Sequence, residues 1–189
     1  MSDVVSFSGC GERGWLTATR GGLGHLAVEY AAKAMAYRVV GVDVDAKKDI
    51  VLKSGAEYFF GLSEDPVEKV KEVTGSLGAK AVLVCSGSNA AYAQALDYLR
   101  WGGTFVAVGI PEGTPVSLPN AFPAVIMAKE LTLVGSAVGN RQDAVEMLDF
   151  AARGVVKVHS RVEKLENLEN IFHELNEGKM QGRVVVDLS

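Results

Sequence analysis

Residues 21–45 read GGLGHLAVEYAAKAMAYRVVGVDVD, a glycine-rich turn followed by a helical pattern and a run of branched residues. The glycines let backbone N–H groups approach an anion, and a helix over 25–35 would place its N-terminus behind them. The strand expected at 38–43 ends in Asp43, 19 residues after Gly24, close to the spacing of about 20 in dinucleotide sites. A carboxylate there accepts both ribose hydroxyls and repels a 2′-phosphate. The stretch therefore predicts a nucleotide-binding unit that prefers NAD to NADP.

The rest of the chain continues the alternation of strands and helices. Expected strands cover 4–8, 38–43, 57–60, 81–85, 104–108 and 131–136, and expected helices cover 25–35, 46–53, 66–74, 89–99 and 123–129. A further helix ends before Gly154, and a strand, a helix and a strand follow at 158–162, 165–177 and 183–187. Apolar strands without strict alternation indicate burial on both faces. The order predicts a Rossmann-type α/β fold, a doubly wound parallel sheet, over residues 1–154, with residues 155–189 as a separate unit.

Composition narrows the class of protein. The chain has 189 residues, a net charge of −4 and 48% hydrophobic residues, which gives no electrostatic basis for nucleic acid or an anionic membrane as a partner. Cys10 and Cys85 cannot build a disulfide framework, and they suit a reducing compartment. No apolar run approaches the ~20 residues of a membrane span, and the first residues lack a secretory pattern. We expect a cytoplasmic protein.

Two arrangements suit the segment before Gly21. In the first, 4–8 is the strand, and Gly9 and Gly11 begin a phosphate loop that Gly21–Gly24 completes, with the nine residues 12–20 inserted between. In the second, 15–20 is the strand and Thr19–Gly24 the loop. We favour the first, because DVVSFSG is the better strand and Arg20 is a poor buried residue. The insertion would then hold the strand away from the helix N-terminus, so NAD binding would be weakened, and deleting 12–20 should strengthen it.

Several segments resemble fungal zinc-type alcohol dehydrogenases of the medium-chain dehydrogenase superfamily. They are GGLGHLAVEYAAKAMAYRVVGVDVD (21–45), GGTFVAVGIPEG (102–113), ELTLVGSAVGNRQDAVEMLDFAARGVVK (130–157) and GKMQGRVVVDLS (178–189). Members of that family begin with a catalytic domain that carries the zinc ligands. The resemblance implies that this domain is missing, that the chain is truncated, and that 155–189 is a remnant of it.

The resemblance also implies a set of cofactor contacts. The set begins with the phosphate loop and an adenosine ribose site that has Lys47 or Lys48 beside it. It also includes backbone around the nicotinamide and a closing arginine that reaches the pyrophosphate. The residues are Gly9, Gly11, Gly21, Gly22, Leu23, Gly24, Asp43, Lys48, Ser86, Val108, Ile110, Ser136, Val138 and Arg183.

A zinc site is not expected. A catalytic zinc takes three protein ligands and a structural zinc usually four. The cysteines and histidines are Cys10, Cys85, His25, His159 and His173, without a CxxC or HxxxH pair. His25, at a helix start, is expected to face solvent or the phosphate loop. No residue can be assigned as catalytic.

Three functional hypotheses follow. The chain is an alcohol dehydrogenase-like domain that binds NAD weakly and lacks zinc-dependent alcohol oxidation. Alternatively it is a repurposed enzyme that carries out a non-redox or cyclising step on a hydrophobic small molecule in the open cleft. The third hypothesis is a non-catalytic interaction protein or a truncated gene product. We also expect a homodimer through the apolar edge strand 131–136, because an unprotected strand edge tends to pair.

Overall fold

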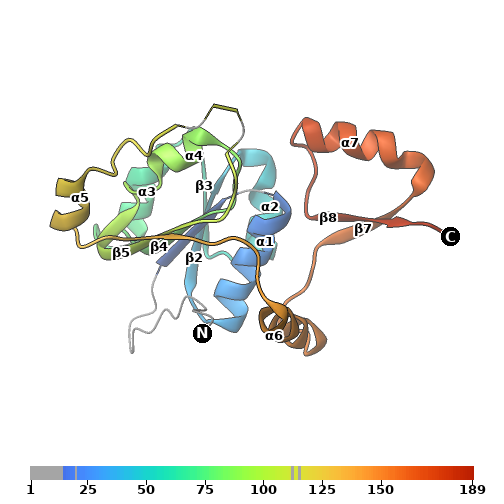
Figure 1. Cartoon of the computed structure of the whole chain (residues 1–189). Coiled ribbons are helices and arrows are strands. Elements are labelled where there is room, and N and C mark those ends of the chain that lie inside the picture. Colours follow the sequence, from blue (N-terminus) through green and yellow to red (C-terminus); the bar gives the residue numbers. More distant parts are fainter. Residues whose placement is uncertain (1–14, 20, 112, 115) are drawn as a thin grey trace.

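A computed structural model describes residues 15–19, 21–111, 113–114 and 116–189. These residues form a parallel six-stranded sheet in the order β3-β2-β1-β4-β5-β6 (Figure 1). The strands are β1 (Trp15–Thr19), β2 (Arg38–Asp43), β3 (Tyr58–Gly61), β4 (Ala79–Val84), β5 (Leu99–Ala107) and β6 (Thr132–Gly135). The order reverses direction between β1 and β4, which makes the sheet doubly wound. The expected α/β fold class is confirmed.

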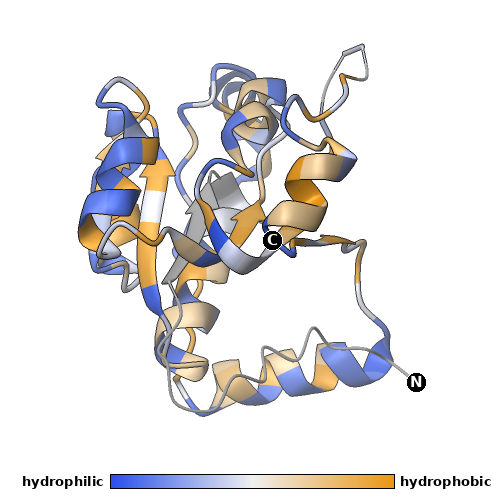
Figure 2. Cartoon of the chain, turned by 90° about the vertical axis from the view of Figure 1, so that its left-hand side faces the viewer, coloured by the Kyte–Doolittle hydropathy of each residue, from blue (hydrophilic) through white to orange (hydrophobic). Residues whose placement is uncertain are grey.

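Helices cover both faces of this sheet. They are α1 (Gly21–Glu29), α2 (Lys48–Lys53), α3 (Pro66–Val73), α4 (Asn89–Gln94) and α5 (Pro123–Ala128), and a further helix, α6 (Arg141–Ala152), follows β6. Val28 of α1 and Val51 of α2 pack with Val39 on one face. Val70 of α3 packs with Val40 on the other. Neighbouring valines of β2 therefore point into opposite cores, which explains the continuous apolar pattern of the strand. Figure 2 shows strands coloured mainly hydrophobic beside helices of mixed character.

The favoured arrangement of the first strand is wrong. β1 occupies the centre of the sheet and pairs in parallel with β2 through Leu16 and Val39, and with β4 through Leu16 and Ala81. Residues 15–19 are therefore strand rather than part of an inserted loop, and a deletion of 12–20 would remove the central strand instead of improving a site. The segment 4–8 lies outside the described residues.

A second difference concerns the expected helix 89–99. α4 ends at Gln94, and β5 begins at Leu99, which pairs with Ala79 ahead of a register irregularity. Leu96 and Leu99 are both buried, and their spacing of three residues is typical of a helix. Leu96 lies in a turn, however, and Leu99 is the first residue of β5. Burial spacing alone does not separate these cases over so few residues.

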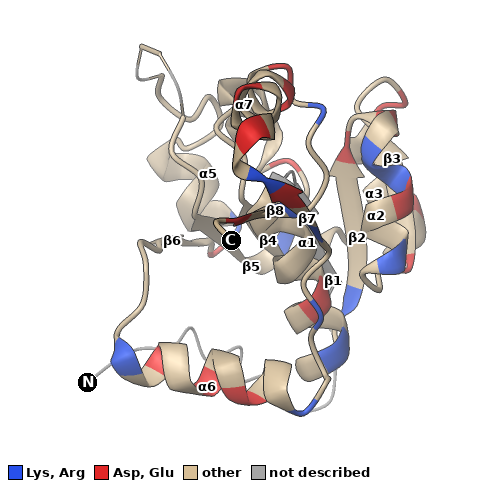
Figure 3. Ribbon diagram, turned by 90° about the vertical axis from the view of Figure 1, so that its right-hand side faces the viewer, with Lys and Arg blue, Asp and Glu red and all other residues tan. Residues whose placement is uncertain are grey.

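The segment after α6 forms a small unit beside α1 and α2 (Figure 1). β7 (Ser160–Lys164) and β8 (Arg183–Asp187) pair in parallel, and α7 (Leu168–Asn176) connects them. α6 stands apart from the sheet and carries charges of both signs (Figure 3). Within the part of the chain that the structure describes, no helix is long and apolar enough to cross a membrane.

Candidate functional site

The carboxyl ends of β1 and β4 face a pocket of about 430 Å³. α1 begins here, so the unpaired N–H groups of its first turn and its positive dipole end lie at the pocket. The C-terminal unit supplies the opposite wall. The lining residues are Gly22, Leu23, Lys47, Cys85, Ser86, Gly87, Leu175, Gly178, Met180, Gly182 and Arg183.

The guanidinium of Arg183 lies against Gly22. A Cβ atom placed on Gly22 would lie 2.7 Å from Cζ and 2.8 Å from Nη1 of Arg183. Only a glycine lets the guanidinium approach this turn so closely. The backbone N–H of Arg183 donates to the carbonyl of His159 at 2.8 Å, which fixes the start of β8. A helix N-terminus together with an arginine provides donors and positive charge for an anion, and a phosphate group fits this chemistry.

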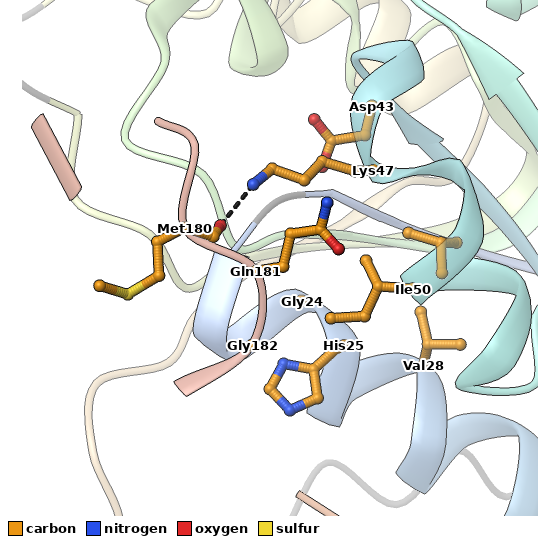
Figure 4. A pocket seen from close by; sticks show the side chains of 10 residues that line it. Gly24, His25, Val28, Asp43, Lys47, Ile50, Met180, Gln181 and Gly182 are labelled. Atoms are coloured by element: carbon orange, nitrogen blue, oxygen red, sulfur yellow. Dashed lines mark hydrogen bonds between the residues drawn. The ribbon is translucent and has the colours of Figure 1, made fainter. Parts of the chain in front are cut away.

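A second corner lies at the end of β2, where Asp43 and Lys47 meet the loop 180–182 (Figure 4). Asp43 is 3% exposed and its Oδ1 accepts from the N–H of Val44 at 2.7 Å. Lys47 is buried, and its Nζ donates to the carbonyl oxygen of Met180. The Nε2 of Gln181 donates to the carbonyl oxygen of Ala46 at 3.2 Å. The loop therefore covers the acidic end of β2.

The two corners differ in how much room they offer a dinucleotide. The first corner, where Arg183 lies against Gly22 and which we call the phosphate corner, is open. Gly22 leaves space here, and any side chain at this position would displace Arg183. The space between His25, Asp43 and Gly182 is about 10 Å³, which suffices for about one water molecule. The residues fit an adenine dinucleotide in their chemistry, but a ribose reaches Asp43 only when 180–182 moves aside.

The loops after β4, β5 and β6 meet at the same edge of the sheet. A Cβ atom on Gly109 would lie 2.4 Å from the carbonyl oxygen of Ser86, so these two loops are in direct contact. The hydroxyl of Tyr92 in α4 donates to the carbonyl of Gly109. The N–H of Ser136 donates to the carbonyl of Ala107 at 2.9 Å. Ile110 and Val138, two of the residues implied near a nicotinamide, project from this edge with exposed side chains.

The structure brings most of the expected site residues together and separates others. Gly22, Leu23, Ser86 and Arg183 line the open pocket, and Gly24 and Asp43 line the small one. Gly21 is the first residue of α1, and Val108 lies half-buried at the end of β5. Gly9 and Gly11 lie outside the described residues.

Of the two lysines expected beside the ribose, the structure places Lys47 and not Lys48 at the pockets. Lys48 is exposed and lines neither pocket, whereas Lys47 is 5% exposed and lines both. A 3₁₀ turn over Asp45–Lys47 precedes α2 and places the first of the two lysines toward Asp43. The sequence does not show which of two adjacent lysines such a turn directs toward Asp43.

The site also contains residues that sequence patterns did not single out. Met180, Gln181 and Gly182 form the loop over Asp43. The segment GKMQGR (178–183) has Gly178 two residues before this loop and Gly182 as its last residue, and this pair of glycines is the signal that could have marked it. His25 is 2% exposed rather than facing solvent, because the C-terminal segment packs over it and the His159 ring lies 5.5 Å away.

Cys85 lines the open pocket, but its thiol is not ionised near neutral pH. Burial raises the pKa of the Cys85 thiol to about 11, so this side chain is not a nucleophile near neutral pH.

The described residues contain no group of metal ligands. Among residues 15–19, 21–111, 113–114 and 116–189, no three His, Cys, Asp or Glu side chains are grouped closely enough to hold a metal ion.

Comparison with known proteins places this site in context. Residues 22–153 match the family model described as zinc-binding dehydrogenase. Alcohol dehydrogenase 2 of Emericella nidulans is 50% identical over 92% of this chain, and an alcohol dehydrogenase of Schizosaccharomyces pombe is 41% identical over 96%. The chain covers 50% and 51% of these relatives, so it spans about half of their length. The crystal structure of the alcohol dehydrogenase of Aeropyrum pernix superposes with a TM-score of 0.82 at 28% identity, covering 92% of this chain and 49% of that one.

Proposed function

Because the chain belongs to the zinc-binding dehydrogenase family, we propose that it binds NAD at the carboxyl edge of the main sheet. The observation that carries this proposal is the approach of Arg183 to Gly22 at the start of α1. The pyrophosphate would lie between the N–H groups of the first helical turn and the guanidinium. When bound, the nicotinamide of this cofactor accepts or donates a hydride.

Asp43 and Lys47 are the proposed ribose contacts. The Asp43 carboxylate accepts hydroxyl donors and repels a 2′-phosphate, so NAD should bind more tightly than NADP. The loop 180–182 must first leave Asp43, which breaks the contacts of Lys47 with Met180 and of Gln181 with Ala46. The cost of opening lowers the apparent affinity by the fraction of open molecules. This supports weak NAD binding for a reason different from an inserted loop.

The backbone around Val108–Ile110 and Ser136–Val138 is the proposed place for the nicotinamide ring. Both loops follow parallel strands, and Ser136 is held beside Ala107. Ligands of open α/β sheets bind outside these strand ends. We propose NAD binding without zinc-dependent alcohol oxidation for this chain, since its sequence contains only two cysteines and three histidines.

Calorimetric titration with NAD, NADP and ADP-ribose tests the proposal. The full chain should bind NAD and ADP-ribose, and NADP more weakly. Arg183→Ala should lower ADP-ribose affinity about tenfold, because one charge-assisted hydrogen bond to phosphate is lost. Arg153→Ala serves as the matched control, since Arg153 pairs with Asp149 on α6 and is away from the pocket. A folded chain that binds neither NAD nor ADP-ribose would overturn the proposal.

A further inference from the structure

Glu29 is a carboxylate buried at the last position of α1. The residue is 0% exposed, and no part of the proposed cofactor site uses it. Its Oε2 accepts from the backbone N–H of Lys157 at 2.9 Å. Its Oε1 lies 2.7 Å from Nζ of Lys33 and 3.4 Å from Nε2 of His159. Removing a carboxylate from water is costly, so these partners must compensate for its burial.

The partners of Glu29 come from two elements. Lys33 follows one turn later on the same helical stretch, and the lysine side chain is 36% exposed. The backbone of Lys157 and the ring of His159 belong to the segment that enters β7. His25, one turn earlier on α1, lies edge-on to the same His159 ring. Glu29 therefore connects residues 157–159 to the C-terminal end of α1.

The segment that Glu29 contacts is also bonded to Arg183, which lies at the start of α1. The carbonyl of His159 accepts the N–H of Arg183 at 2.8 Å. Gly182, with φ +69°, lies so close that a Cβ atom would be 2.0 Å from the same carbonyl oxygen. Arg183 then extends to Gly22 at the start of α1. The C-terminal unit thus contacts α1 at two points. Glu29 binds the segment 157–159, and Gly22, seven residues earlier and about 10 Å away along the helix axis, contacts Arg183.

We infer that Glu29 is a positioning residue for Arg183, acting through Lys157 and His159 to hold the guanidinium over the start of α1. The inference rests on the proposed function, in which Arg183 meets the pyrophosphate. Glu29 itself does not line the pocket that contains Arg183. Its effect on binding should therefore depend on the presence of Arg183.

Two variants and a double-mutant cycle test this role. Glu29→Ala removes all three contacts and should weaken ADP-ribose binding about tenfold. Glu29→Gln keeps an acceptor for the Lys157 N–H and should restore affinity to within about threefold of the unmodified chain. In the Arg183→Ala background, Glu29→Ala should change affinity less than about twofold, because the two residues act as one unit. Glu68→Gln, which removes an exposed partner of Lys71, is the control and should leave affinity unchanged.

Amide hydrogen exchange separates this inference from the proposed function. Exchange at Arg183 and Val184 should be faster in Glu29→Ala than in the unmodified chain, and near normal in Glu29→Gln. Equal exchange in all three proteins would overturn the positioning role even where ADP-ribose binds. Additive losses in the double mutant would overturn it as well. Failure of the unmodified chain to bind ADP-ribose, with exchange changing as expected, would overturn only the proposed function.

Discussion

The Nζ of Lys47 donates a hydrogen bond to the carbonyl oxygen of Met180, so the turn before α2 is tied to the loop before β8. Both residues line the open phosphate pocket and the small pocket around Asp43. The contact closes the ribose corner while Arg183 remains in place at the phosphate corner. Access to Asp43 and the position of Arg183 are therefore controlled by different hydrogen bonds.

Loosening the loop at Gln181 should strengthen NAD binding. Gln181→Ala removes the bond from Nε2 to the carbonyl of Ala46, which favours the closed loop. A net value of about 0.5–1.5 kcal/mol for this bond corresponds to an affinity gain of roughly two- to tenfold. Calorimetry with NAD measures it, and Gln142→Ala on α6 is the control. Weaker binding by Gln181→Ala would show that the loop supports the ribose instead of covering it.

A methyl group at Gly22 should displace Arg183 and lower affinity for ADP-ribose. The contact would be with the end of a flexible side chain, so the free energy of unfolding should change little while binding falls about tenfold. Gly22→Ala is compared with Gly135→Ala, where a Cβ atom meets nothing within 4 Å. Thermal unfolding and calorimetry separate the two effects. Unchanged binding by Gly22→Ala would contradict the phosphate corner.

Alkylation of Cys85 should rise with pH up to about pH 11. The thiolate is the reactive form, and burial holds the thiol pKa at about 11. At pH 8, about one thiol in a thousand is ionised. Iodoacetamide labelling of a Cys10→Ser variant, followed by mass spectrometry, measures the rate. Bound ADP-ribose should slow labelling, since Cys85 lines the phosphate pocket. A plateau near pH 9, or no protection, would contradict this placement.

The chain should be a homodimer through β6. This strand lies at the edge of the main sheet, and the side chain of Leu133 on it is 37% exposed. A lysine at an edge strand opposes pairing, so Leu133→Lys should yield monomers. Light scattering at micromolar concentration compares it with Leu77→Lys, a change at an exposed loop leucine. A monomeric unmodified chain would refute pairing through this edge.

Zinc should not confer alcohol oxidation on this chain by itself. Its two cysteines and three histidines supply no ligand pair at the usual spacing. Ethanol-dependent NADH formation should match between samples with added zinc and samples with a chelator. A zinc-dependent rate above the chelated control would refute the expectation.

Local patterns in the sequence were sufficient to predict the fold class and part of the candidate site. Burial on both faces leaves an uncharged run at 39–42 with three valines, and Asp43 ends this run at the carboxyl end of the strand. The glycines at 21, 22 and 24 mark a helix start that admits an anion. These features depend on residues close in sequence. The structure confirms that β2 ends at Asp43, whereas α1 begins at Gly21, four residues before the expected start of this helix at His25.

Long-range packing decided the rest. The segments 4–8 and 15–19 both suit a strand locally, and only simultaneous pairing with β2 and β4 selects Trp15–Thr19. Glu29 looks like an exposed helical glutamate until Lys157, 128 positions later, covers it and supplies an N–H donor. Lys47 is distinguished from Lys48 by the loop at Met180, which reaches it from the far end of the chain. Sequence spacing specifies neighbours along an element, whereas burial and partner choice are set by segments that meet only after folding.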